Sequence, residues 1–159
     1  MGSSGCYNRI VELLSRFQDF LNNHPDINVG QGVVAGVSGG PDSLAMLDLL
    51  RRLPDGQVSR VMTAHLDHAL RSESSKDAKF VQHTARKWGF PVVVERKDVA
   101  KLAATNKLSV EEAGRQARYA FLARVAVDHR VNSIFVAHNA DDQAETVLMH
   151  VLRGAGLAG

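Results

Sequence analysis

The sequence contains one cysteine, Cys6, in 159 residues, and this scarcity excludes several kinds of site. A single cysteine cannot form a disulfide within the chain, and it cannot supply the paired thiols of a zinc site or a sulfur relay. No apolar run approaches the ~20 residues that a membrane-spanning helix needs. The first residues also lack the basic and apolar regions of a signal peptide. These absences predict a cytoplasmic protein with no membrane partner.

The composition is that of an ordinary globular domain. Hydrophobic residues make up 45% of the chain and charged residues 23%, and 159 residues suffice for one domain with a substantial core. The sequence shows no repeat, linker or low-complexity stretch. Residues 1–7 are mostly small and polar, and we expect them to be a flexible or artificial N-terminal segment outside the fold.

Charge is unevenly distributed along the chain. Residues 71–130 hold 13 Lys and Arg against 7 Asp and Glu, whereas the remainder holds 6 against 10. A basic segment facing an acidic site suits a polyanionic partner such as a nucleic acid. Ordinary charge scatter on a solvated surface explains the same numbers equally well.

Apolar periodicity predicts alternating helices and strands. Helices are expected at residues 8–23, 42–53, 72–88, 109–129 and 140–152, and strands at 33–37, 58–66, 92–94 and 134–137. This alternation is typical of an α/β, Rossmann-like parallel sheet with helices on both faces. In such sheets, ligands bind beyond the carboxyl ends of the strands. Three polar clusters, at residues 38–43, 65–67 and 138–142, follow predicted strands and should meet at that edge.

The first cluster is the segment Ser38-Gly39-Gly40-Pro41-Asp42-Ser43, between a predicted strand and a predicted helix. Its glycines allow a tight turn and close approach of a ligand, and Pro41 suits the first helical position. Backbone N–H groups at a helix N-terminus bind anions, so we expect a phosphate site. The segment is not a Walker A loop, because no lysine lies near it. The plain alternative is that Asp42 and Ser43 only cap the helix.

The second cluster lies in His65-Leu66-Asp67-His68-Ala69-Leu70-Arg71. We interpret it as part of a nucleotide pocket in which Asp67 orients a ribose, a water or a cation. Metal binding by His65 and His68 is an alternative with little support, because no third ligand stands at a clear spacing. An ordinary polar surface loop is a further alternative.

Two pairs of charged residues complete the candidate site. Arg115 and Arg118 are three residues apart on a predicted helix, so they share a side and could hold phosphate; the alternative is an exposed face paired with Glu111 and Glu112. Asp142 and Glu145 also share a face and could hold Mg²⁺ or an ammonium group. Acidic residues in a first helical turn are favourable in any case.

Together these stretches resemble a known family. The loop SGGPDS is similar to the PP-loop of the ATP pyrophosphatase superfamily, whose members cleave ATP between the α- and β-phosphates. With HLDHALR, EEAGRQARY and AHNADDQAETVLMHVLRGAGLAG, in this order, the chain resembles the tRNA(Ile)-lysidine synthetase family. The resemblance implies that residues 8–159 form a PP-loop ATP-binding catalytic domain of the adenine nucleotide alpha hydrolase-like type, cut short at its C-terminal end.

The resemblance also implies an activity. Enzymes of this family join free L-lysine to C2 of the wobble cytosine in the CAU anticodon of an isoleucine tRNA, through an adenylated tRNA, giving lysidine, AMP and pyrophosphate. ATP and Mg²⁺ are then required, and Asp42 serves the metal. Arg115 or Arg118 neutralises charge on the phosphate. Asp142 and Glu145 hold the lysine, and either takes its proton.

Other functions stay open at this point. The chain could be another PP-loop enzyme, for tRNA thiolation or amide formation, although thiolation commonly uses paired cysteines. It could also be a nucleotide-binding module without turnover. The oligomeric state is open, and a homodimer is one option. Gly114 stands where the family more often has alanine, and a glycine costs ~1 kcal/mol inside a helix.

Overall fold

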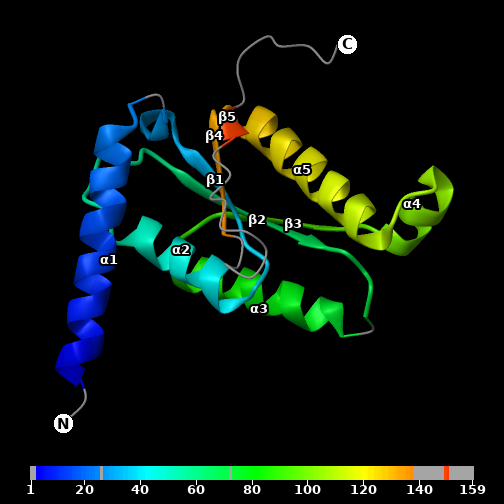
Figure 1. The fold of residues 1–159 in the computed structure, drawn as a ribbon, viewed down its shortest axis with the longest axis horizontal. Coiled ribbons are helices and arrows are strands. Elements are labelled where there is room, and N and C mark those ends of the chain that lie inside the picture. Colours follow the sequence, from blue (N-terminus) through cyan, green and yellow to red (C-terminus); the bar gives the residue numbers. More distant parts are fainter. Residues whose placement is uncertain (1–2, 26, 72, 138–148, 151–159) are drawn as a thin grey trace.

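In the described part of the chain, the fold is a five-stranded sheet with helices on both faces, seen in a computed structural model (Figure 1). The structure describes residues 3–25, 27–71, 73–137 and 149–150. The helices are α1 (Ser3–Asn23), the short 3-10 helix η1 (Val29–Gln31), α2 (Pro41–Arg51), α3 (Ser74–Lys87), α4 (Val99–Asn106) and α5 (Val110–His129). The strands are β1 (Val33–Gly36), β2 (Val61–Asp67), β3 (Val92–Arg96), β4 (Ser133–Val136) and β5 (Met149–His150).

The strand order is β3-β2-β1-β4-β5. Strands β1 to β4 are mutually parallel, with Val33 of β1 opposite Val61 of β2 and Ser133 of β4. From β1 the chain passes to β2 and β3 on one side, and β4 then pairs with the other side of β1. The strand order therefore reverses next to β1. Ligands of such sheets bind at this crevice, beyond the carboxyl ends of the strands.

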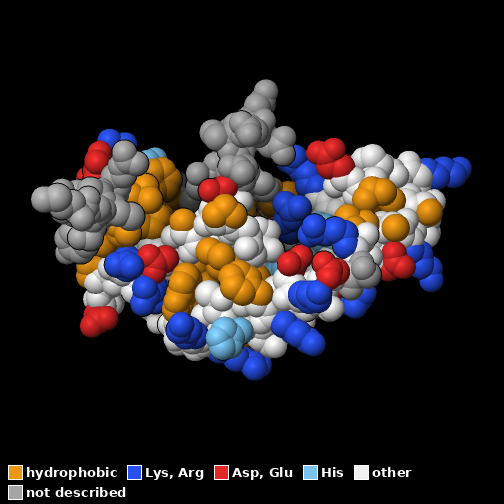
Figure 2. All heavy atoms as spheres, turned by 90° about the horizontal axis from the view of Figure 1, so that it is seen from below, with side chains coloured by type: hydrophobic (Ala, Val, Ile, Leu, Met, Phe, Trp, Pro, Cys, Tyr) orange, Lys and Arg blue, Asp and Glu red, His pale blue; other side chains and the backbone are white. Residues whose placement is uncertain are grey.

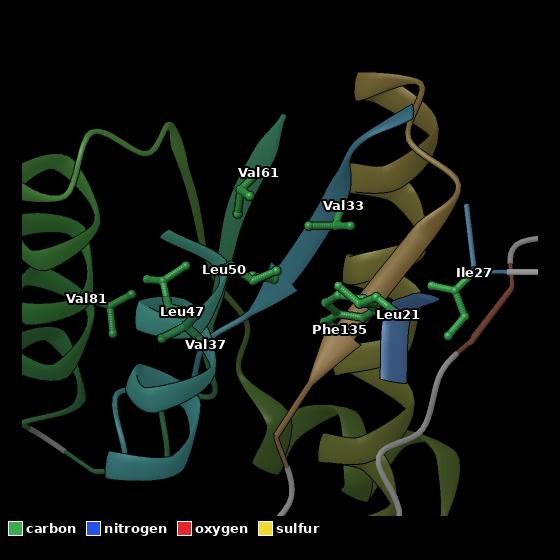
Figure 3. Close-up of a cluster of buried hydrophobic side chains, with 10 residues drawn as sticks. Leu21, Ile27, Val33, Val37, Leu47, Leu50, Val61, Val81 and Phe135 are labelled. Carbon is green, nitrogen blue, oxygen red and sulfur yellow. The ribbon is translucent and has the colours of Figure 1, made fainter. Parts of the chain in front are cut away.

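Alternate residues of β1 belong to two separate cores. Val33 and Ala35 pack with α1, α2 and α3, whereas Val34 packs with α5 on the opposite face. Figure 3 shows the first core, where Leu47 of α2 and Val81 of α3 lie close together. A third, small cluster joins α4 to α5. This burial on both faces explains why the strands have nearly continuous apolar sequences.

Local sequence signals account for several element boundaries. Pro41 occupies the start of α2, where its missing N–H is no loss. The Ser109 hydroxyl accepts a hydrogen bond from the Glu112 N–H at 3.1 Å and caps α5, as the Ser-x-x-Glu pattern predicts. Gly36 lets α5 and β4 come close to β1, because a Cβ there would lie 2.9 Å from Cγ1 of Val136.

The prediction of an α/β, Rossmann-like sheet covered on both faces is confirmed, and most boundaries differ by only a few residues. The first helix is longer than expected and begins at Ser3 instead of residue 8. Helix α4 was not expected at all. Its signals were the N-cap Asp98, which accepts a hydrogen bond from the Lys101 N–H at 2.9 Å, and the left-handed Lys107 that ends it.

The helix expected at residues 140–152 is wrong at residues 149–150. Met149 and His150 form β5, which pairs antiparallel with β4, so the sheet is not wholly parallel. These two residues lie within the apolar run Val147-Leu148-Met149-His150-Val151, and a run that short fits a strand as well as a helix. Residues 140–148 and 151–152 of the expected helix lie outside the described residues.

In the part of the chain that the structure describes, no helix combines the length and the hydropathy that a membrane crossing requires.

Candidate nucleotide-binding site

A cleft of about 420 Å³ opens at the carboxyl edge of the sheet. Its walls come from the ends of β1, β2 and β4, from the start of α3 and from one side of α5. The polar residues that line it are Ser38, His65, Asp67, His68, Arg71, Ser74, Asp77 and Arg118. The first two predicted clusters therefore meet, as expected. The third, residues 138–142, lies outside the described residues, although Ala137 just before it lines the cleft.

The loop between β1 and α2 is held by two serine hydroxyls. Ser43 is buried, and its hydroxyl donates to the Gly40 carbonyl oxygen at 2.9 Å. Because that uses its only proton, Ser38 must be the donor in the 3.2 Å contact between the two hydroxyls. The Gly39 N–H donates to Ser43 Oγ and the Gly40 N–H to Ser38 Oγ, both at 3.3 Å. These last two bonds are long, so an incoming anion can replace them at small cost.

Glycine is found at residues 39 and 40 of the loop for two different physical reasons. Gly39 has φ +95°, and a Cβ there would lie 3.2 Å from Cγ2 of Val81. The fold itself therefore requires glycine at residue 39. Gly40 has φ −73°, which any residue adopts, and a Cβ there would approach nothing closer than Ser38 Oγ at 3.5 Å. The space beside Gly40 is thus open to a ligand.

His65 connects the ends of β1 and β2. Its side chain is buried, and Nδ1 lies 2.7 Å from the Val37 carbonyl oxygen. Since a carbonyl can only accept, Nδ1 carries the proton. His65 lines the cleft. The bond to Val37 uses Nδ1, so Nε2 is the ring nitrogen left for a ligand.

Asp67 is a buried carboxylate at the end of β2. Its Oδ1 accepts a hydrogen bond from the Ala69 N–H at 2.9 Å, and its Oδ2 lies 3.7 Å from Nε of Arg96. Burial raises the pKa of Asp67, but the Ala69 N–H and the Arg96 guanidinium contribute to a larger opposing effect, so the pKa lies below its usual value. Asp67 is therefore ionised at neutral pH and gives the cleft a fixed negative charge.

His68 and Arg118 both line the cleft, His68 from the loop after β2 and Arg118 from α5. Burial lowers the pKa of His68, and the positive charge of Arg118 lowers it further. His68 is therefore neutral at pH 7 and can both donate and accept a hydrogen bond. Arg118 reaches the cleft from α5 and supplies a cation there.

Only one of the two predicted arginines, Arg118, lines the cleft. Arg115 is exposed, does not line the cleft, and lies with its guanidinium 5.7 Å from the centre of the Tyr119 ring. Within the described residues neither arginine pairs with Glu111 or Glu112, and Glu112 instead accepts a hydrogen bond from Gln116 at 3.0 Å. Arg118 is the better candidate for a phosphate contact.

Asp42 is exposed in the first turn of α2, beside the glycine loop, and is not part of the cleft lining. Among the described residues, no three His, Cys, Asp or Glu side chains lie close enough to hold a metal ion together. A magnesium site of the phosphate-assisted kind needs only one or two carboxylates. The position of Asp42 fits that kind of site. Asp142 and Glu145 lie outside the described residues.

Sequence reasoning passed over part of the lining. Ser74 and Asp77, at the start of α3, and Phe121 and Leu122, on α5, all line the cleft. Asp77 forms an ion pair with Arg71 at 3.2 Å. The signal for α3 was available, because the N-terminus of a helix after β2 must lie near the same edge of the sheet as the loop after β1.

A second hollow of about 290 Å³ lies between β3, α4 and α5. It shares Leu66 and Phe121 with the cleft, and its charged residues are Glu95, Lys97 and Arg124. Glu95 and Arg124 form an ion pair with each other. This hollow lacks the glycine loop and the buried carboxylate of the larger cleft.

The basic segment is not one continuous patch. Ion pairs join Lys76 to Glu73, Arg71 to Asp77 and Arg96 to Asp67. Figure 2 shows one face of the molecule, on which Lys and Arg side chains lie intermixed with Asp and Glu side chains. The excess of positive charge predicted from the sequence is thus partly compensated at the surface.

The parallel order β3-β2-β1-β4, the cleft beside β1 and the glycine loop ahead of α2 define a Rossmann-like α/β protein with an anion-binding loop. The family comparison is more specific. Residues 10–159 match the PP-loop domain family, and the chain belongs to that family.

Two curated relatives of the chain are both named tRNA(Ile)-lysidine synthase. The chain is 42% identical over 148 residues to a tRNA(Ile)-lysidine synthase of Geobacter sulfurreducens, covering 92% of this chain and 31% of the relative. It is 39% identical over 140 residues to the enzyme of the same name from Clostridium tetani, covering 87% of this chain and 30% of the relative. The chain thus spans about a third of the length of these relatives.

Solved structures support the fold. A U34-tRNA thiolase from Methanococcus maripaludis, with its [4Fe-4S] cluster, matches 85% of this chain and 48% of its own at a TM-score of 0.66 and 16% identity. An NH3-dependent NAD synthetase from Campylobacter jejuni matches 86% of this chain and 58% of its own at a TM-score of 0.60 and 18% identity.

Proposed function

We propose that the chain is the ATP-binding catalytic part of a tRNA(Ile)-lysidine synthase. The observation that carries this proposal is the cleft in which the Ser38 end of the glycine loop meets Asp67 and Arg118, in a chain 39–42% identical to enzymes of that name. Thiolation is less favoured, because the chain has only Cys6 and the thiolase-like structure is similar in fold alone.

ATP binds with its phosphates on the loop of residues 38–43. The long 3.3 Å bonds from the Gly39 and Gly40 N–H groups to serine hydroxyls support this, because phosphate oxygens make stronger, charge-assisted bonds to the same donors. The open space beside Gly40 supports it too. His65 and Asp67 line the nucleotide on the β2 side. Asp42 would hold Mg²⁺, which would lower the charge repulsion between phosphates.

The reaction has two steps at this edge of the sheet. The O2 oxygen of the wobble cytosine attacks the α-phosphate of ATP, the bond to the β-phosphate breaks, and pyrophosphate leaves. The ε-amine of lysine then attacks C2 and AMP leaves with the oxygen. Arg118 stabilises the negative charge that develops on the phosphate. Asp142 and Glu145 hold the lysine and accept its proton, because an ammonium group is no nucleophile.

The test measures the two half-reactions separately, in a protein of the relatives' length that carries this chain. Wild type should release pyrophosphate when given ATP, Mg²⁺ and the tRNA, and should form lysidine when lysine is added. Asp142→Asn and Glu145→Gln should retain most of the first half-reaction and raise the KM for lysine. If both variants lose adenylation first and keep normal lysine dependence, these acids belong to the ATP–Mg²⁺ site.

A matched control separates the charge of the acids from general damage. Gln143→Ala, between them in the sequence, should leave both half-reactions within about twofold of wild type. Lysidine formation without added ATP and without release of pyrophosphate would contradict the proposal. Transfer of sulfur to the tRNA would contradict it as well.

A further inference from the structure

Gly114 lies in the first half of α5, where a glycine lowers helix stability by roughly 1 kcal/mol relative to alanine. It is buried, and its φ is ordinary, so the backbone does not require glycine. A glycine is favoured there because the His68 side chain occupies the space next to it. A Cβ at residue 114 would lie 3.2 Å from both Cε1 and Nδ1 of His68, tighter than nine in ten such contacts, so the ring would have to move by a few tenths of an ångström.

The His68 ring thus lies close to the α5 backbone, because Gly114 has no side chain to keep it away. The backbone of His68 is bonded to α4, because its carbonyl oxygen accepts a hydrogen bond from the Val99 N–H at 3.3 Å. Val99 begins α4, which packs against the start of α5 (Figure 1). Val99 Cγ1 would itself lie 3.6 Å from a Cβ at Gly114. The β2 loop, α4 and α5 therefore meet at Gly114.

What this packing provides is a polar ring on the wall of the cleft. His68 lines the cleft with Arg118, and within the described residues no group hydrogen-bonds to its ring nitrogens. The charged and titratable groups that face it are Arg118 from α5 and His65 and Asp67 from β2. A neutral imidazole has both a donor and an acceptor to offer to a ligand.

We infer that Gly114 is a positioning residue of the nucleotide cleft: without a side chain at this residue, the His68 imidazole can lie against α5 beside Arg118 and make a hydrogen bond to the bound nucleotide. The inference rests on the proposed ATP site. It gives His68 a role as a nucleotide contact, distinct from the two alternatives of metal binding and a plain surface loop. It also explains why a glycine stands at residue 114, although glycine lowers helix stability.

The test is a double-mutant cycle on the 159-residue chain, with ATP affinity measured by calorimetry. His68→Ala should weaken ATP binding about tenfold, the loss of one good hydrogen bond. Gly114→Ala should weaken it about three- to tenfold in wild type and by less than twofold in the His68→Ala background, because there the new methyl group meets no ring. Gly30→Ala is the matched control, since a Cβ there meets only Asn28 Oδ1 at 3.5 Å; it should leave ATP affinity unchanged.

Two further readouts do not depend on ATP. Nuclear Overhauser contacts should join the Hε1 proton of His68 to the α-protons of Gly114 in the free chain. Gly114→Ala should raise the melting temperature in the His68→Ala background and fail to raise it in wild type, because only wild type must displace the ring.

The possible failures are distinct. No ATP binding by wild type would overturn the proposed function and the nucleotide contact with it. Normal ATP binding by wild type, His68→Ala and Gly114→Ala would overturn the inference and leave the proposed function standing. Equal weakening by Gly114→Ala with and without the His68 ring would show that Gly114 acts on the helix and not on His68.

Discussion

Nδ1 of the buried His65 donates a hydrogen bond to the Val37 carbonyl oxygen over 2.7 Å, and this bond ties the end of β1 to the end of β2. Val37 is the last residue before the loop at residues 38–43. The bond therefore fixes the start of that loop relative to the strand that carries Asp67.

Replacing His65 tests the link. His65→Leu keeps an apolar body of similar size but leaves the Val37 carbonyl oxygen buried without its donor, so we expect a loss of about 1–3 kcal/mol in the free energy of unfolding. Urea unfolding measures it. His83→Gln, at an exposed position of α3, is the control and should change stability by less than about 0.5 kcal/mol. An equal effect of the two changes would show that the link contributes nothing.

The glycine loop gives a prediction that separates folding from binding. Gly40→Val should cost less than about 1 kcal/mol, because φ is −73° there and the nearest atom to a Cβ is Ser38 Oγ at 3.5 Å, yet it should weaken ATP binding at least tenfold by filling the phosphate space. Gly39→Ala should itself destabilise the fold by about 1–2 kcal/mol, since its φ is +95°. Thermal unfolding and ATP titration of both variants give the comparison.

A folded Gly40→Val variant with wild-type ATP affinity would remove the phosphates from this loop. Gly39→Val is the less informative variant, because its side chain would also meet Val81, so loss of binding could follow from misfolding alone.

Much of the fold was predictable because the local signals agreed with the tertiary structure. The run Val33–Val37, the two glycines and Pro41 predict strand, loop and helix, and all three form. Helix α4 was missed because it has only eight residues, and because its signals, a cap at Asp98 and a left-handed Lys107, are weak in a sequence. Strand β5 was missed because its pairing with β4 is a long-range contact that overrides the local pattern.

The site residues in the loops after β1 and β2 were predictable from the sequence, and those on helix α5 were less so. A spacing of three residues puts Arg115 and Arg118 about 60° apart on a helix, and the sequence cannot say which of them faces the sheet edge. The packing of Phe121 and Leu122 against β1 and β4 decides this, and it turns Arg118 toward the cleft. The contact between Gly114 and His68 joins residues from separate elements, so no local pattern reveals it.

Asp67 gives a prediction about pH. Its pKa is lowered in the fold, so its ionised form contributes stability that is complete above the unfolded-state pKa of about 3.9 and is lost as the pH falls through the lower folded-state pKa. Asp67→Asn should lower the free energy of unfolding at pH 7 by about 1–2 kcal/mol. The difference between wild type and variant should shrink as the pH falls below the unfolded-state pKa and through the lower folded-state pKa.

Chemical denaturation across this pH range measures the difference. Asp128→Asn, at an exposed position of α5, is a suitable control and should give a difference that changes little with pH. A deficit of Asp67→Asn that is the same at pH 3 and pH 7 would mean that the charge of Asp67 contributes nothing to stability.

Asp42 gives a prediction about metal dependence. If its carboxylate serves Mg²⁺, Asp42→Asn should raise the Mg²⁺ concentration needed for half-maximal AMP formation several-fold, because the metal would lose a charged ligand. Asp48→Asn lies on the same helix, but Asp48 pairs with Arg51 and Arg52 and does not line the cleft, so it should leave the Mg²⁺ titration unchanged. Identical titrations for Asp42→Asn and wild type would remove Asp42 from the metal site.

The central claim is that ATP occupies the cleft at the carboxyl ends of β1, β2 and β4. The most direct measurement is to record backbone amide chemical shifts of the chain during titration with ATP and Mg²⁺. We expect the largest changes at residues 38–43 and 65–69 and at Arg118, with small changes at Glu95 and Arg124 of the second hollow. Changes centred on that second hollow, or no saturable change anywhere, would contradict the account.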